Sequence, residues 1–361
     1  METIRISFKY ALLIAAALFV SSAPAQAFGN RFDWENLQSD IAGVAEFTDT
    51  NLVNSWGMAL SPSGTIFVND NGTGVATLYN QDGTPAPNRS HPLVITIPPS
   101  ASNSTGTSAP TGIVLNPTAL FKVSNGASSL PARLIFVSED GAISGWNPQL
   151  NGTRAFIAVD NGAAGSVYKG ATLGASNGHN FLFVTNFHFN RVETYDENFV
   201  RVNLGGFVDP GIPSNFAPFG IRNFNGKIYV TYAEQKPPDN HDDLAGPGHG
   251  FISIFDTAGK FIQRLVSHGN LNSPWGLALR GFPVGDLEEV GLWVGNFGDG
   301  RINVYSPTTG AFIGTPMKSD GTPLDFNGLW DLLPIGGNVY FAAGIADESH
   351  GLFGVIFEGG D

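Results

Sequence analysis

The sequence predicts an all-β protein, a six-bladed β-propeller of four-stranded blades, and three observations carry this prediction. A unit of short apolar strands separated by Gly, Pro, Asn and Asp recurs six times along the 361 residues. The 46 glycines and 23 prolines are enough for many tight turns. A step of 50 to 58 residues, about four strands with their turns, is the length of one blade. The glycines that open the six units are Gly57, Gly112, Gly170, Gly220, Gly276 and Gly328.

The strands follow in the same order within each unit. Runs rich in Val, Ile, Phe, Tyr and Thr, bounded by turn residues, predict them. The first unit has its strands near 56–60, 65–69, 74–79 and 91–96. The next four units have theirs at 133–137, 142–146 and 153–159; at 181–185, 191–195 and 201–207; at 227–231, 251–255 and 261–266; and at 292–295, 301–305 and 311–315.

The two ends of the repeat region complement each other. The sixth unit stops after three strands, the last at 351–357, while a strand-like stretch at 41–48 precedes the first unit. We therefore expect this N-terminal stretch to supply the outer strand of the last blade, which hides an edge that would invite aggregation. Residues 28–361 then form a single propeller domain.

Residues 1–27 have the pattern of a cleaved signal peptide. Arg5 and Lys9 give a basic start, residues 11–20 are an apolar run too short to span a bilayer, and Ala25 and Ala27 are small residues ahead of a cleavage site. The alternative is a membrane anchor. The pattern predicts export, with the mature protein secreted or periplasmic, and no later segment is long and apolar enough to hold it in a membrane.

Composition excludes several classes of function. The chain has no cysteine, so disulfides, thiol catalysis and thiolate metal sites are excluded. Its formal net charge of −13 argues against nucleic acid and anionic membranes as partners, because both reward basic surfaces. We expect a monomer whose partner is a small molecule, a carbohydrate or a protein.

The turns between second and third strands should meet around the central channel, and all six are polar. Carboxylate and amide oxygens gathered there predict a hard cation, calcium before zinc. The alternative is that pairs such as Asn71-Gly72 and Asp299-Gly300 serve only turn formation. The expected calcium ligands are Asn69, Asp70, Glu139, Asn186, Asn296 and Asp347.

Three of these turns, the third at 186–190, the fourth and the sixth at 347–350, carry residues that a turn does not require. The fourth is stretched over 234–250 and is rich in carboxylates and imidazoles, and long loops in compact domains are often functional. Glu234, Asp242 and Asp243 are therefore candidate ligand-binding residues. Carboxylates and imidazoles close together also suit acid and base chemistry. The catalytic candidates are His188, His241, Asp347, Glu348 and His350.

Three tryptophans hold similar places at the start of the innermost strands. Trp56, Trp275 and Trp330 are candidate platforms on which a sugar or another flat ligand stacks. The alternative is that these rings wedge between blades, which their repetition at equivalent positions favours.

Several motifs carry a resemblance to known proteins. The segments at 51–57, 71–74, 139–148, 217–220, 241–248, 272–279, 295–300 and 348–354 together resemble a family of uncharacterised secreted bacterial β-propeller proteins. More locally, 274–279, 292–294 and 300–305 are similar to the NHL repeat, which implies a six-bladed propeller that serves as a binding scaffold or as a lyase. Wider relatives include calcium-dependent gluconolactonase-like hydrolases, but their site is not matched residue by residue here, so that activity is not carried over.

Two functions fit the sequence. The first is an exported module that binds a ligand or a protein through the loop-bearing face of the channel, with the 234–250 insertion as its rim. The second is a calcium-dependent hydrolase or lactonase with the cation held in the channel. Propellers host both classes, so the fold does not choose between them.

Overall fold

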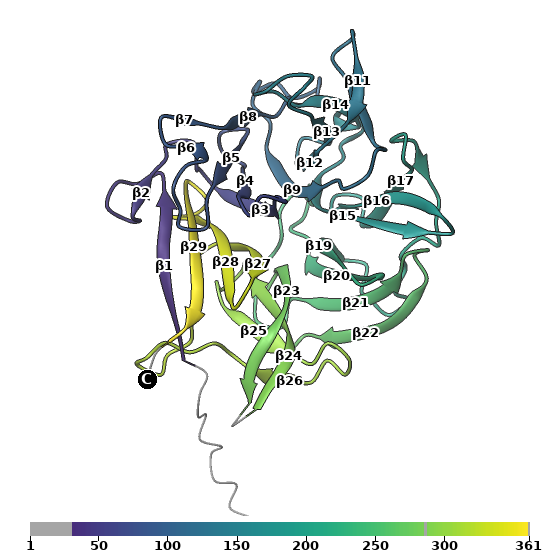
Figure 1. The fold of residues 1–361 in the computed structure, drawn as a ribbon. Helices are drawn as coiled ribbons and strands as arrows, with labels where there is room; N and C mark the ends of the chain where they lie inside the picture. Colours follow the sequence, from purple (N-terminus) through teal and green to yellow (C-terminus); the bar gives the residue numbers. More distant parts are fainter. Residues whose placement is uncertain (1–30, 285–286, 360–361) are drawn as a thin grey trace, which may run out of the picture.

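The computed structural model describes residues 31–284 and 287–359, and the signal-peptide prediction for residues 1–27 lies outside them. Six blades, five of them four-stranded sheets and the sixth a four-stranded blade extended by one short strand, are arranged around a central axis, which confirms the predicted all-β propeller (Figure 1). In the described residues the only helix is the 3-10 turn η1 (Gly162–Ala164). None of their helices is long and apolar enough to cross a membrane.

The first three blades run from the innermost strand outward. Blade 1 is β3 (Ser55–Leu60), β4 (Ile66–Asp70), β5 (Val75–Tyr79) and β8 (Val94–Thr96). Blade 2 is β9 (Pro110–Leu115), β12 (Leu134–Ser138), β13 (Ala142–Trp146) and β14 (Phe156–Asp160). Blade 3 is β15 (Tyr168–Ser176), β16 (His179–Asn186), β17 (Arg191–Tyr195) and β18 (Arg201–Val202). Two short hairpins lie outside the blades, β6 (Pro87–Asn88) with β7 (His91–Pro92) and β10 (Lys122–Ser124) with β11 (Ser129–Pro131).

The other three blades complete the ring. Blade 4 is β19 (Phe216–Phe224), β20 (Lys227–Glu234), β21 (Phe251–Asp256) and β22 (Phe261–Ser267). Blade 5 is β23 (Pro274–Val284), β24 (Leu287–Asn296), β25 (Ile302–Tyr305) and β26 (Phe312–Gly314). Blade 6 is β27 (Leu329–Ile335), β28 (Asn338–Ile345), β29 (His350–Glu358) and, from the other end of the chain, β1 (Phe32–Ser39).

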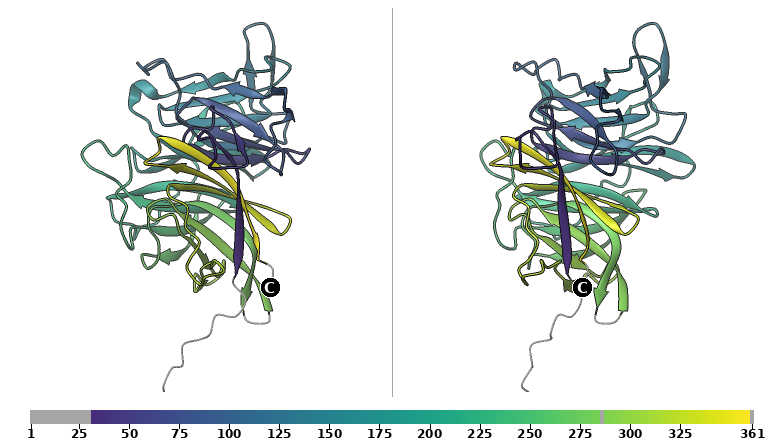
Figure 2. Two further views of the ribbon diagram at one scale, coloured as in Figure 1. Left: turned by 90° about the vertical axis from the view of Figure 1, so that its left-hand side faces the viewer. Right: turned by 60° about the vertical axis from the view of Figure 1, so that its left-hand side comes forward.

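Closure by an N-terminal strand is confirmed, but the predicted strand was misplaced. Strand β1 pairs antiparallel with β29 from Phe32↔Glu358 to Ser39↔Leu352, and the two lie side by side in Figure 2. The predicted stretch 41–48 adds only β2 (Phe47–Thr48), which pairs with the outer side of β1. The earlier segment closes the ring because its apolar residues Phe32 and Leu37 are buried in the core.

Five of the six opening glycines lie where inner strands approach each other most closely. A Cβ on Gly57 would lie 2.5 Å from the carbonyl oxygen of Thr111, and one on Gly276 would lie 2.5 Å from that of Trp330. The sixth assignment, Gly328, was wrong, because Asp331 follows Trp330 as Gly57 follows Trp56.

Asp331 is accommodated at the axis because its carboxylate has partners there. It is 1% exposed and accepts hydrogen bonds from the backbone N–H groups of Met58 and Leu332, both at 2.8 Å. The guanidinium of Arg222, on blade 4, donates to it across the axis at 2.7 Å. Both partners of this ion pair line a cavity of about 20 Å³ among the inner strands.

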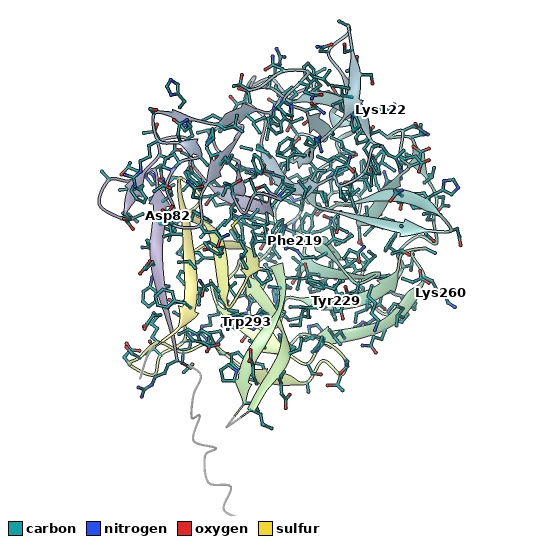
Figure 3. All side chains as sticks on the ribbon, viewed as in Figure 1. Asp82, Lys122, Phe219, Tyr229, Lys260 and Trp293 are labelled. Carbon is teal, nitrogen blue, oxygen red and sulfur yellow. The ribbon has the colours of Figure 1, made fainter. Side chains whose placement is uncertain are left out.

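The core lies in the interfaces between blades and at the axis. Each interface is filled by side chains of two neighbouring sheets, as Phe67 of blade 1 and Phe136 of blade 2 show. At the axis itself an aromatic cluster, here called the aromatic plug, fills the channel, with Phe219 at the centre of the molecule (Figure 3). The plug consists of Trp56, Phe187, Phe219, Trp275 and Trp330.

Candidate functional site

A chain of polar side chains crosses the channel mouth above the aromatic plug. The Nδ2 of Asn54, before blade 1, donates to Oε1 of Glu348 on blade 6 at 3.3 Å and to Oδ1 of Asn71 at 3.3 Å. Asn71 donates to Oε2 of Glu139 on blade 2 at 2.9 Å, and Oε1 of Glu139 accepts from Lys169 on blade 3. This relay joins four blades around one axis.

Lys169 is the centre of this relay and is only 2% exposed. Its ammonium lies 5.2 Å from the ring of Trp56, 5.8 Å from that of Phe187 and 5.9 Å from that of Phe219, within the range of cation–π attraction. Burial by itself would lower the pKa of Lys169, but the carboxylate of Glu139 outweighs it, so the pKa is raised above its usual value. The residue is therefore a fixed buried cation.

Asn54 connects the relay to the plug below it. Its Oδ1 accepts hydrogen bonds from the indole N–H groups of Trp56 at 3.0 Å and Trp330 at 3.2 Å. Asn54 has a φ of +50°, a conformation that asparagine tolerates better than most residues. One side chain thus satisfies two buried indoles and holds Glu348.

Glu348 is half-buried next to these groups. Burial, followed by the negative charge of Glu139, raises the pKa of Glu348 to about 7. The three residues Ala346, Asp347 and Glu348 all have positive φ, so this turn is held in an uncommon conformation by its surroundings.

The 234–250 insertion folds back toward the channel mouth. Its base is fixed by Glu234, whose carboxylate lies 2.9 Å from Nδ1 of His249. Nδ1 of His241 lies 2.8 Å from Oδ1 of Asp242, and this contact raises the pKa of His241 and lowers that of Asp242. Burial raises the pKa of Asp243, whose Oδ2 has no hydrogen-bond partner among the described residues. The insertion therefore brings an imidazole and two carboxylates to the relay.

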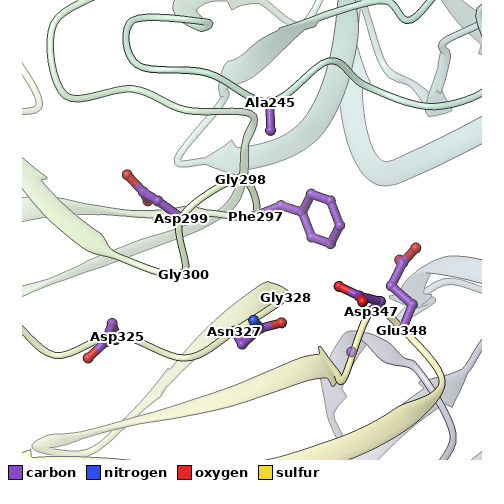
Figure 4. Close-up of a pocket in the computed structure, with 11 residues that line it drawn as sticks. Ala245, Phe297, Gly298, Asp299, Gly300, Asp325, Asn327, Gly328, Asp347 and Glu348 are labelled. Atoms are coloured by element: carbon purple, nitrogen blue, oxygen red, sulfur yellow. The ribbon is translucent and has the colours of Figure 1, made fainter.

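Two hollows open beside the relay on this face. The first, about 320 Å³, lies between blades 5 and 6 and is shown in Figure 4. We call it the acceptor hollow, because its polar side chains are four carboxylates and an amide. Glycine backbone forms part of its wall, which lets a ligand approach closely. The side chains that define the acceptor hollow are Phe297, Asp299, Asp325, Asn327, Asp347 and Glu348.

Negative charge in the acceptor hollow is mostly unpaired. Of its four carboxylates only Asp325 has a basic partner within the described parts of the chain, Lys318 at 2.6 Å. Phe297 stacks on Trp330 with ring centroids 4.0 Å apart, so the plug continues into the floor of the hollow. The hollow therefore combines hydrogen-bond acceptors with an aromatic ring.

The second hollow, about 420 Å³, lies on the other side of the relay, near blades 2 and 3. Its lining includes Glu139, Asp140, Ser166, His188, Asp239 and His241. We call it the imidazole hollow. Nδ1 of His188 lies 2.8 Å from the carbonyl oxygen of Asp239, and this contact holds the imidazole in place.

The structure divides the predicted catalytic residues between these places. His188 and His241 line the imidazole hollow, whereas Asp347 and Glu348 line the acceptor hollow. His350 lies in neither lining, because its Nδ1 contacts Asp40 at 2.6 Å near the closing strand. The sequence reasoning placed all five on one face, and the structure separates them into two hollows and an outer contact with Asp40.

The six expected calcium ligands do not meet at one point. Asn69 donates to the carbonyl oxygen of Thr111, Asn186 to Glu193 and Asn296 to the carbonyl oxygen of Asn270. These three amides are fully buried at strand ends in different blades. The Oδ1 atoms of Asn186 and Asn296 accept backbone N–H groups there, whereas Oδ1 of Asn69 has no hydrogen-bond partner among the described residues.

The three expected carboxylate ligands are separated too. Asp70 is fully buried in blade 1, and both its carboxylate oxygens lack a hydrogen-bond partner among the described residues. Burial raises the pKa of Asp70 well above its usual value. Asp347 lies in the acceptor hollow and Glu139 in the relay.

A different group of side chains within the described ranges has the spacing of a metal site. Ligand atoms of Glu139, His241 and Asp242 lie within 4.8 Å of one another. Both oxygens of Glu139 are already engaged, one by Lys169 and one by Asn71. The ammonium of Lys169 holds the place of a cation in this cluster, so the donor set suits calcium poorly.

The candidate stacking platforms lie inside the aromatic plug. Trp56 and Trp330 are each 1% exposed, and they stack on each other with centroids 3.4 Å apart. Trp275 is also buried, and its indole donates to the carbonyl oxygen of Lys169 at 3.2 Å. The ring that reaches a hollow is Phe297, which the sequence analysis did not single out.

Lys169 is the main residue that sequence reasoning missed. It precedes Gly170 just as Trp56 precedes Gly57 and Trp275 precedes Gly276. A cation at a position that is aromatic in other repeats was the signal that could have marked it. Asn54 and the carboxylate Asp325 were missed because neither lies in a turn between second and third strands.

Comparison with known proteins gives relatives of this chain. No family model matches it. The uncharacterized protein L690 of Acanthamoeba polyphaga mimivirus is 31% identical over 327 residues, which are 87% of this chain and 82% of L690. The uncharacterized protein R648 of the same virus is 30% identical over 331 residues, 89% of this chain and 78% of R648. These relatives are viral, so they do not support the bacterial part of the resemblance, and secretion stays a prediction.

Solved structures support the fold. The soluble aldose sugar dehydrogenase of Escherichia coli aligns with a TM-score of 0.53 at 12% identity, over 91% of this chain and 100% of that chain. A catalytically inactive virginiamycin B lyase from Staphylococcus aureus aligns with a TM-score of 0.51 at 15% identity, over 91% and 99%. At these identities the likeness shows the fold alone. By sequence, the chain belongs to the same protein family as the uncharacterized mimivirus proteins L690 and R648.

Proposed function

We propose that this protein is a ligand-binding module and that its site is the acceptor hollow. The observation that supports this most is the excess of acceptors there, with four carboxylates and only one basic partner among the described residues. Acceptors outnumber donors in a hollow of four carboxylates and one amide, which favours a ligand rich in O–H or N–H groups. A volume of about 320 Å³ suits a small molecule, since such sites measure roughly 300–1,000 Å³.

The rest of the channel mouth supports a preformed site. The buried Lys169, the relay and the aromatic plug fix the floor, so binding costs little reorganisation. Export of the module follows from the predicted signal peptide and remains part of the proposal.

Thermal unfolding in the presence of donor-rich probes tests this function. We would screen spermidine, tetramethylammonium and common monosaccharides against the wild type, Asp347→Asn and Glu289→Gln. Asn accepts the positive φ of position 347, and Glu289 is an exposed carboxylate on the blade 5 hairpin, so the second variant is the matched control.

We expect at least one donor-rich probe to raise the melting temperature of the wild type and of Glu289→Gln, but much less that of Asp347→Asn. Tetramethylammonium has no donor and should have a smaller effect. At a concentration of about 100 times Kd the stabilisation would be about 2.7 kcal/mol. Stabilisation that Asp347→Asn leaves unchanged would place binding elsewhere and overturn the assignment.

Hydrolysis at the imidazole hollow is the second candidate. It is favoured by the contact between His241 and Asp242, which orients an imidazole beside Glu139. Because the donor set suits calcium poorly, we derive no step through a metal. Hydrolysis of p-nitrophenyl esters and γ-lactones by the wild type, lost in His241→Ala and indifferent to chelator, would support it. Equal rates for both proteins would exclude His241 as its base.

A further inference from the structure

A third hollow, about 250 Å³, lies beside the acceptor hollow on blade 5. Asp299 lines both hollows, so they adjoin at this residue. We call the third hollow the amide hollow, since it is lined by Asn270, Asn272, Asp299, Arg301, Asn303 and Thr315.

Two buried amides are built into its wall. Asn272 is 6% exposed, and its Oδ1 accepts from the backbone N–H of Gly246 at 2.7 Å. Its Nδ2 donates no hydrogen bond within the described residues and is not among the fully buried atoms, so solvent or a ligand can reach it. Asn303 is 4% exposed and is fixed by Thr315 at 3.2 Å and by the carbonyl oxygen of Asn270 at 3.1 Å. An unengaged amide donor at the wall of a hollow can bond an acceptor of a polar ligand.

The amide hollow differs in chemistry from its neighbour. It offers donors as well as acceptors, and the guanidinium of Arg301 offsets the carboxylate of Asp299. A polyamine would be repelled by the positive charge of Arg301, and its N–H donors would face the N–H donors of the hollow. A chain of hydroxyl groups both donates and accepts and carries no charge, so it matches both hollows.

We propose that the two hollows are adjoining subsites for an oligosaccharide, with Asp299 at the boundary between them. This rests on the proposed binding function and specifies its ligand class. One sugar ring lies in the acceptor hollow, where carboxylates accept its hydroxyls and Phe297 offers an aromatic face to its C–H groups. The next ring lies in the amide hollow, against Asn270, Asn272 and Arg301.

The test is the dependence of affinity on chain length. Titration calorimetry would use the mono-, di- and trisaccharides of β-1,4-linked glucose, mannose, xylose and N-acetylglucosamine, with spermidine as the charged comparison. Variants are Asp347→Asn in the acceptor hollow and the double variant Asn270→Ala/Arg301→Ala in the amide hollow. Both positions of the double variant are exposed, so folding should be retained, and circular dichroism checks this.

We expect one series to bind about tenfold more tightly as the disaccharide than as the monosaccharide. The double variant should lose that gain while keeping the monosaccharide affinity, and Asp347→Asn should weaken both. Binding without length dependence, or a gain that the double variant retains, would overturn the proposal. Binding of spermidine alone, sensitive to Asp347→Asn, would also overturn it while leaving the proposed binding function standing. No binding by any probe would overturn both.

Discussion

Individual charges at the channel mouth are set by their neighbours. Glu348 has a pKa of about 7 because it is half-buried next to the carboxylate of Glu139, and Lys169 stays protonated because the same carboxylate faces it. The relay thus holds a cation at Lys169 and, at Glu348, a group whose pKa lies near neutrality.

The free energy of unfolding should reflect this titration. The pKa of Glu348 is raised from 4.5 unfolded to about 7 folded, so the folded state binds the extra proton between these values. Its contribution to stability is full below pH 4.5 and is lost as the pH rises through about 7. The free energy of unfolding of the wild type should therefore fall with rising pH in this window, with a slope that corresponds to about one proton. We expect Glu348→Gln to lack this slope and to be more stable than the wild type above pH 7. Urea unfolding between pH 4.5 and 8 measures this, with Glu289→Gln as control, and parallel curves for wild type and Glu348→Gln would contradict it.

Removing Lys169 should leave Glu139 as an unpaired charge. We expect Lys169→Met to lower the free energy of unfolding by about 3 kcal/mol, as breaking a buried ion pair does. The double variant Lys169→Met/Glu139→Gln should regain at least about half of that loss, because the neutral amide has no charge to compensate. Urea denaturation measures the free energy of unfolding of both variants. A double variant as unstable as the single one would show that the loss comes from packing and not from the unpaired charge.

The indole contacts of Asn54 can be tested in the same way. Asn54→Ala removes the acceptor of two buried N–H groups, at a cost of about 1–3 kcal/mol for each group left unsatisfied. The replacement also meets a positive φ that alanine disfavours. Asn54→Gly avoids this backbone strain, so its melting temperature in thermal denaturation should be higher than that of Asn54→Ala. Equal melting temperatures of the two variants would show that backbone strain has no role.

Inner strands are spaced by glycine, and this explains the periodicity of the sequence. Gly276→Ala would place a Cβ 2.5 Å from the carbonyl oxygen of Trp330, so blades 5 and 6 must separate. We expect a loss of about 1–3 kcal/mol, as in overpacked cores. Gly152→Ala is the matched control, because a Cβ there meets no atom within 4 Å and φ is not positive. If both variants unfold at the wild-type temperature, close strand approach is not what selects the glycines.

Much of the fold followed from the sequence, because turns and strand composition are local. The second and third strands of most blades lie within a few residues of their predicted ranges. The outer strand predicted at 201–207 shrinks to Arg201–Val202, since Gly205 and Gly206 adopt positive φ and leave the sheet. The closing strand was misplaced because pairing with β29 is a contact between chain ends that no local pattern encodes.

The candidate site was predicted less well, for a physical reason. Turn residues such as Asp347 and Glu348 were found because they are polar beyond what a turn needs. Lys169 and Asn54 owe their importance to partners on other blades, which only the closed ring brings together. Asn186 and Asn296 were expected at the channel, but Asn186 donates to Glu193 of its own blade and Asn296 to the carbonyl oxygen of Asn270.

Closure makes the whole propeller depend on its N-terminal strand. Deletion of residues 1–40 removes β1, with the buried Phe32 and Leu37, and exposes the edge of β29. We expect a loss of at least about 4 kcal/mol from their burial, and self-association through the open edge. Deletion of residues 1–27 is the control and should unfold at the temperature of the full chain. Thermal denaturation with light scattering compares the two, and equal behaviour would contradict closure by β1.

The proposed binding face draws on several blades, because blades 5 and 6 supply the acceptor hollow while the plug and the relay form its floor. The most direct test is a crystal structure of the protein soaked with the probe that stabilises it most in the thermal screen. We predict ordered density for that probe in the acceptor hollow, within hydrogen-bond distance of Asp347 and against the ring of Phe297. Density for the probe at another place, with the acceptor hollow filled only by water, would contradict the assignment of this face as the binding site.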